Sequence, residues 1–170
     1  MRTGQETSRE QLKFLHYLAK SHKPKAGEPP WPALSGKNFV LWLVAAGLLE
    51  KDNEGPLKML FSPADRQLAF PGTAAYAGVT LDSLRSQRFP RLTSDAGRRN
   101  GDAGFALTPQ SPPATTALFA DLSFADGALV AFLDGRVRYL NRRDLGLGPT
   151  DPLVAGPTSK SALLQSLSAE

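Results

Sequence analysis

The residue types that most often carry out chemistry are scarce in this 170-residue chain. It has no cysteine, which excludes disulfides, thiolate nucleophiles and Cys-ligated zinc, and it has two histidines. His16 and His22 are six residues apart, so they do not share a helix face as an i, i+4 metal pair does. The chain also lacks the G-x-S-x-G motif of a serine nucleophile. We therefore predict that the protein is not an enzyme, with no catalytic residue, no bound metal and no cofactor.

Three aspartates in the second half of the chain raise the question of calcium, which prefers carboxylate and loop carbonyl ligands. They are Asp121, Asp126 and Asp134. Asp126 and Asp134 are each followed by glycine, and turn formation alone explains an Asp-Gly pair. The sequence therefore leaves calcium binding open and favours turns at these two positions.

Arginines supply a candidate surface for binding an anion. The net charge is +4 and the pI is about 9.6, which is mildly basic. Arg98 and Arg99 lie in a glycine-rich segment, and Arg136 and Arg138 follow an Asp-Gly pair. Nucleic-acid-binding domains usually cluster Lys and Arg more densely, and single-strand binders interleave them with aromatic residues. A soluble basic module for nucleic acid or acidic polysaccharide is therefore the alternative function, and we expect no tight nucleic-acid binding.

The second Asp-Gly pair stands between two apolar runs in ALVAFLDGRVRYL, which is a strong signal for a β-hairpin. A two-residue type I′ turn needs φ > 0 at both positions, which Asp134 tolerates and Gly135 prefers. This turn would pair Phe132 with Val137 on one buried face of the hairpin. The opposite, solvated face would carry Ala131, Leu133, Arg136 and Arg138.

Two helices are expected before the strands. TSREQLKFLHYLAKSHK predicts a helix from about Ser8, and SGKNFVLWLVAAGLL predicts a mostly buried helix capped at Ser35 and stopped by Gly47 or near Asn53. The segment from Thr93 is rich in turn formers and predicts a long surface loop. Strands are expected at Leu57–Phe61, Thr116–Asp121, Val130–Leu133 and Arg136–Leu140.

This order of elements predicts an α+β fold in which an N-terminal helix packs on an antiparallel β-sheet, with short helices and long loops. The length suits one domain, which we expect to span residues 1–147. Residues 148–170 are predicted to form a C-terminal tail with a short helix that frays.

Three segments also resemble a known family. ALVAFLDGRVRYLNRRDL resembles the C-terminal signature of the pilin-like proteins abundant in planctomycete-type bacteria, where an aromatic residue, Asp-Gly and a second aromatic residue close the last sheet. LKFLHYLAKSH looks like the tail of a pilin's long helix, and LKMLFSPAD is similar to the F-C-P-S-D segment, with Ser62 in place of Cys and Ala64 in place of Ser. The residues that match the family's motifs are Phe61, Pro63, Asp65, Phe132, Asp134, Gly135 and Val137.

The resemblance implies a pilin-like fold in which these residues have a structural role. The chain would be a non-enzymatic structural or interaction domain like a pseudopilin of a type II secretion or type IV pilus-like system. Its partners would be other subunits of that system, in the periplasm or cell envelope. Such proteins begin with a cleaved leader and an apolar helix of roughly 20 residues, which this chain lacks. Membrane anchoring is therefore expected only through an N-terminal helix that is absent here.

Overall fold

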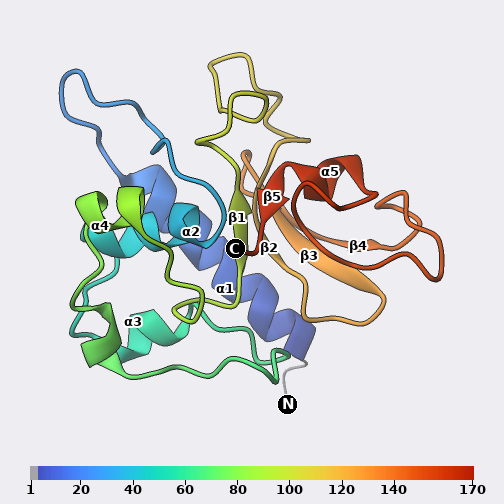
Figure 1. Ribbon diagram of the computed structural model, residues 1–170, viewed down its shortest axis with the longest axis horizontal. Coiled ribbons are helices and arrows are strands. Elements are labelled where there is room, and N and C mark those ends of the chain that lie inside the picture. The colour runs from blue at the N-terminus through green and yellow to red at the C-terminus, as the bar shows by residue number, and fades with distance from the viewer. Residues whose placement is uncertain (1–3) are drawn as a thin grey trace.

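A five-stranded antiparallel sheet lies at the centre of the protein in the computed structural model, which describes residues 4–170 (Figure 1). The strand order is β4-β3-β2-β1-β5, so the strand nearest the C-terminus pairs with β1 at one edge. The strands are β1 (Ala96–Arg98), β2 (Ala117–Asp121), β3 (Gly127–Phe132), β4 (Val137–Asn141) and β5 (Leu167–Ser168).

The helix α1 (Gly4–Ser21) packs on one face of this sheet, where it contacts β2, β3 and β4. Its buried residues recur every three or four positions, which places them on one stripe of the helix: Ser8, Leu12, Leu15 and Ala19. The outward side is polar except for Tyr17, whose side chain is 69% exposed. The amphipathic pattern read from the sequence therefore produces the predicted contact between helix and sheet.

The helix α2 (Lys37–Ala45) is buried along most of its length and lies against β1. It starts after Gly36 and ends before Gly47, which adopts a φ of +79°. The predicted cap at Ser35 is thus one residue early, and the predicted stop at Gly47 is correct. The remaining helices are short: α3 (Glu54–Lys58), the 3₁₀ helix η1 (Thr73–Tyr76), α4 (Leu81–Ser86) and α5 (Ala162–Gln165).

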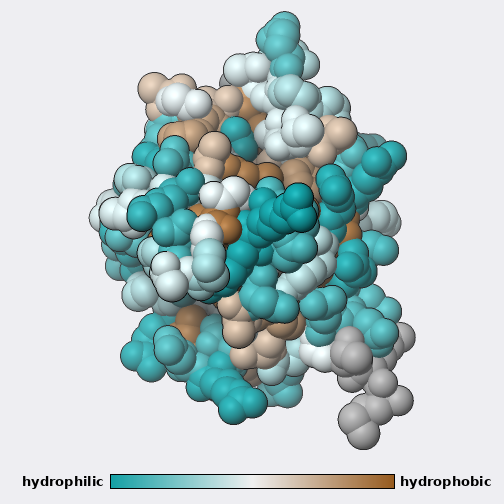
Figure 2. Space-filling view, turned by 90° about the vertical axis from the view of Figure 1, so that its right-hand side faces the viewer, coloured by the Kyte–Doolittle hydropathy of each residue, from teal (hydrophilic) through white to brown (hydrophobic). Residues whose placement is uncertain are grey.

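The sheet separates two hydrophobic cores, because α1 and α5 lie on its opposite faces (Figure 1). The larger core joins α1 and α2 to Leu129, Ala131 and Val137 of the sheet. The smaller core joins Val130 and Phe132 to the C-terminal segment. On the side drawn in Figure 2 the surface is mostly hydrophilic, and hydrophobic residues show as separate patches.

The predicted fold class is confirmed: helices accompany an antiparallel sheet, and the N-terminal helix packs on that sheet. Among residues 4–170, no helix is both long enough and apolar enough to cross a membrane. The segment 148–170, predicted to be a tail with a short helix, contains the short helix α5 and also supplies β5. Leu164 and Leu167 of this segment are fully buried, so it completes both the sheet and the smaller core.

The hairpin is present, but its predicted register is wrong by one residue. Val137 pairs with Ala131, and the Phe132 amide donates to the Arg136 carbonyl at 2.9 Å. The loop therefore has three residues, with a turn closed by the Gly135 amide and the Phe132 carbonyl at 2.9 Å. Of the three loop residues, only Gly135 takes a positive φ, which is +92°. Phe132 and Val137 are both buried as predicted, yet they face opposite cores.

The expected strand at Leu57–Phe61 is also wrong, because a short helix and a turn occupy this region. Pro56 lies in the first turn of α3, where a proline is tolerated since the amide it lacks has no partner within the helix. Leu57 lies within α3 and is fully buried.

Candidate functional site

A buried carboxylate joins three separate segments of the chain. Asp121, at the end of β2, has an exposed fraction of 0%. Its Oδ2 accepts a hydrogen bond from Ser8 Oγ of α1 at 2.5 Å and another from the Ser62 hydroxyl. Its Oδ1 accepts from the Ser123 amide at 2.9 Å. These three donors stabilise a charged carboxylate inside the protein and tie α1 and the 61–65 segment to the sheet.

A second buried carboxyl lies beside the first. Ala96 pairs with Ala120, so Asp95 lies opposite Asp121 where β1 and β2 meet, and Asp95 is 2% exposed. Burial raises the pKa of Asp95 well above its usual value, and the neighbouring charge of Asp121 raises it further. Burial and the neighbouring Asp121 therefore both favour the protonated form of Asp95.

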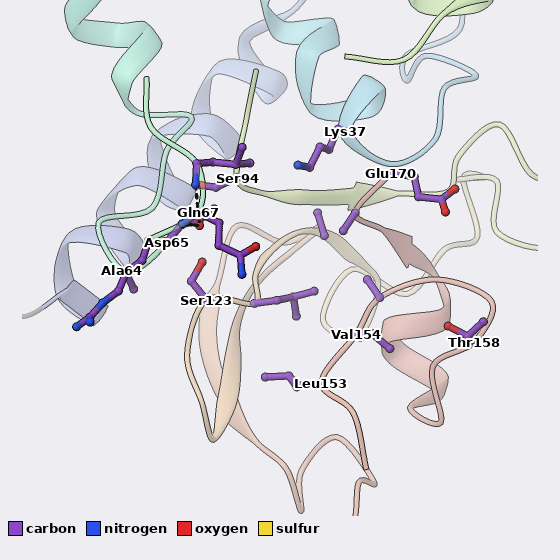
Figure 3. A pocket seen from close by; sticks show the side chains of 16 residues that line it. Lys37, Ala64, Asp65, Gln67, Ser94, Ser123, Leu153, Val154, Thr158 and Glu170 are labelled. Atoms are coloured by element: carbon purple, nitrogen blue, oxygen red, sulfur yellow. Dashed lines mark hydrogen bonds between the residues drawn. The ribbon is translucent and has the colours of Figure 1, made fainter. Parts of the chain in front are cut away.

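A pocket of about 780 Å³ opens next to these strand ends (Figure 3). Lys37 of α2 lies on one side of it, and Leu153 and Val154 lie on the opposite side. Asp65 and Gln67 come from the loop after α3. The pocket thus has a charged, polar wall and an apolar wall, both contributed by segments distant in sequence.

Lys37 is the charged group most deeply set in the pocket wall, with an exposed fraction of 7%. Its Nζ donates to the Pro90 carbonyl at 2.6 Å. Burial lowers the pKa of Lys37, and the charges of Asp65 and Asp95 act in the opposite direction. Asp65 itself is occupied within its own turn, since Oδ1 accepts from the Gln67 amide at 2.8 Å and from the Leu68 amide at 3.2 Å.

The residues matched to the family motif build the architecture of the protein. Phe61 is 8% exposed and packs edge-on against Phe70, while Pro63 is exposed and Asp65 closes the turn after it. Asp134 accepts from the Arg136 amide at 3.0 Å, which stabilises the hairpin loop. The motif segments lie apart in the chain but are linked through α1. Ser8 reaches Asp121 beside Ser62, and His16 bonds the Leu133 carbonyl in the hairpin loop at 3.1 Å.

The four candidate arginines do not form one exposed basic surface. Arg98 lies on β1 rather than in a loop, is 9% exposed and donates to the Phe105 and Ala117 carbonyls at 2.9 Å. Arg99 pairs with Asp102 at 2.6 Å. The long surface loop predicted from Thr93 is therefore wrong at Arg98, because β1 pairs with both β2 and β5. Arg136 and Arg138 are exposed as predicted.

The candidate metal ligands are likewise engaged elsewhere. Asp126 accepts a hydrogen bond from the Tyr139 hydroxyl, so the three aspartates considered for calcium have separate partners. His22 bonds Glu28 at 3.0 Å and packs on Trp42. Within residues 4–170, no three His, Asp or Glu side chains form a group suited to a metal ion.

Comparison of the chain with protein-family models, with curated proteins and with solved structures finds no match. The sequence pattern marked Asp121 only as a possible calcium ligand and Ser8 only as the start of the first helix, which in fact begins at Gly4, and it gave no role to Asp95 or Lys37. One signal was present, because an aspartate ends the apolar run TTALFAD and a charge there needs buried partners.

Proposed function

We propose that this chain is a non-enzymatic structural or interaction domain that resembles a pseudopilin of a type II secretion or type IV pilus-like system. It would act in the periplasm or cell envelope, and its partners would be other pilin-like subunits. The proposal rests on the family resemblance of three segments together with their role in this fold.

The observation that carries the proposal is the way the N-terminal helix is held. α1 lies on the antiparallel sheet through its apolar stripe, and Ser8 and His16 fix it to Asp121 and to the hairpin loop. These two contacts thus hold the helix on the sheet, one of them through the hairpin segment that carries the family resemblance. The outward side of α1, with Tyr17 at its centre, remains accessible for contact with another subunit.

The exposed residue Tyr17 gives a direct test in native cells. A photo-crosslinking amino acid would replace Tyr17 in the full gene product, and a matched variant would carry it at Arg138, an exposed position on β4. We expect light-dependent adducts with other copies or with pilin-like subunits in the envelope fraction, formed from position 17 only. Equal adducts from both positions, or a protein recovered wholly outside the envelope fraction, would contradict the proposal.

The alternative of a basic binding module gains no support from the arginines. Arg98 and Arg99 are directed to carbonyls and to Asp102. Only two of the four candidate arginines, Arg136 and Arg138, are therefore left exposed for contact with phosphates. We expect affinity for a labelled oligonucleotide of about 10⁻⁴ M or weaker at physiological salt. Sub-micromolar binding in fluorescence anisotropy, lost in Arg136→Ala/Arg138→Ala, would instead favour that alternative.

A further inference from the structure

We propose that the pocket beside β1 binds a carboxylate carried on an apolar chain, with the Lys37 ammonium as its counter-ion. Two sources share this chemistry: a medium-chain carboxylic acid and the C-terminal end of an apolar peptide. The inference goes beyond the proposed assembly role and does not depend on it, because the pocket and the outward side of α1 are different surfaces.

The hydrogen-bonding capacity of the Lys37 ammonium group is only partly used. An ammonium group has three N–H donors, and among the described residues the Lys37 ammonium donates to one acceptor, the Pro90 carbonyl. A carbonyl carries no compensating charge, and a buried charge without a counter-charge is costly. Lys37 lines the pocket, so its remaining donors can reach a ligand there.

The carboxyl groups nearest to Lys37, those of Asp65 and Asp95, are engaged in other ways. Asp65 has its charge stabilised by the Gln67 and Leu68 amides of its own turn. Asp95 lies beside Asp121, and the raised pKa of Asp95 favours its neutral form. Neither forms an ion pair with Lys37 in the described part of the chain. Of the other charged lining residues, Arg66 is itself a cation, and the Glu170 carboxylate pairs with Arg88 at 2.8 Å.

The wall of the pocket opposite Lys37 is apolar. Val154 in this wall is 37% exposed, and it is one of three exposed large hydrophobic residues among those described. Figure 3 shows Leu153 and Val154 on the side of the pocket away from Lys37. A volume of about 780 Å³ lies within the range typical of small-molecule sites. The apolar lining residues include Ala96, Leu122, Leu153, Val154, Ala155 and Ala169.

Isothermal titration calorimetry with matched charged and uncharged probes tests this inference on the intact protein. Octanoate is compared with 1-octanol, and the acetylated tripeptide Leu-Val-Leu with a free carboxylate is compared with its amide. A charge-assisted hydrogen bond to Lys37 predicts at least tenfold tighter binding of the charged member of a pair. Lys37→Met should abolish that difference, whereas Lys25→Met, which removes an exposed lysine, should leave it unchanged.

A preference for octanoate identifies a small carboxylic acid as the source, a preference for the free peptide identifies a protein C-terminus, and either supports the proposal. If Lys37→Met fails to fold, wild-type protein answers the question through pH. The octanoate preference must then fall as the pH rises through the pKa of Lys37, which lies below its ordinary value of 10.5, while octanol binding stays constant. Equal binding within both pairs, or an unchanged preference in Lys37→Met, overturns the inference. The crosslinking test of assembly is unaffected by either result.

Discussion

Replacing Asp121 by alanine should remove the contact that joins α1, the 61–65 segment and the sheet. The change takes one acceptor from Ser8 and Ser62, whose exposed fractions are 1% and 5%, and from the Ser123 amide. Hydrogen bonds to a charged group contribute about 1.5–3 kcal/mol each. Such contributions are not additive for groups that share one acceptor. We therefore expect Asp121→Ala to lower the free energy of unfolding by about 3–5 kcal/mol.

Urea denaturation of a double-mutant cycle measures this contact directly. Asp121→Ala, Ser62→Ala and the double variant should give a coupling free energy of about 1–3 kcal/mol, because the two side chains touch. Asp126→Ala is the matched control, since Asp126 is exposed and should cost less than about 1 kcal/mol. A coupling near zero, with a loss below about 1 kcal/mol for Asp121→Ala, would refute the view that this carboxylate joins the three segments.

Three further changes test other parts of the fold. Gly135→Val should destabilise the protein by about 1–3 kcal/mol in thermal or urea unfolding, because φ is +92° and a Cβ would lie 3.0 Å from the His16 ring. The control is Gly104→Val, because nothing lies within 4 Å of a Cβ at that position. A loss of stability in Gly135→Val no larger than in Gly104→Val would contradict this expectation. Gly97→Ala should cost about 3 kcal/mol or more, since its Cβ would lie 2.0 Å from a backbone oxygen before α2, and Gly104→Ala is again the control. Asp95→Asn should stabilise the protein relative to wild type, increasingly from about pH 4 upward. The raised pKa of Asp95 means that the folded wild type binds more protons than the unfolded chain. The stability of the wild type therefore falls as the pH rises from 3.8 to the pKa of Asp95 in the folded state. An advantage of Asp95→Asn that is constant between pH 4 and 8 in urea unfolding would show that Asp95 does not titrate in this way.

The sequence predicts the helix-on-sheet arrangement well because α1 and the hairpin carry their own periodic patterns. It does not settle the hairpin register, since Asp-Gly suits a two-residue loop as well as a three-residue loop. Distant contacts make that choice here: the Leu133 amide donates to the Thr116 carbonyl at 2.8 Å, and the Asp134 amide donates to the Pro113 carbonyl at 3.0 Å. The segment before β2 therefore holds the loop in a form that no local pattern reveals.

The candidate site was less predictable for the same reason. Arg98 belongs to a strand of three residues that exists because β2 and β5 pair with it, and its own stretch has no apolar alternation. Lys37 and Asp95 acquire their character from burial by segments far along the chain. Sequence patterns report what a residue's neighbours are in the chain, whereas pKa shifts and pockets depend on its neighbours in space.

The pairing of β5 with β1 also affects the order in which this protein is assembled during synthesis. Arg98 pairs with Leu167, which is 69 positions further along the chain, so β1 can pair only with β2 until that later segment has been made. Until then β1 presents a bare edge, and the smaller core lacks Leu164 and Leu167. Exposed strand edges and unfilled apolar surface are features that promote association between nascent chains. A folding intermediate that lacks β5 is therefore more prone to association than the complete fold, in which the C-terminal segment covers both the edge of β1 and the smaller core.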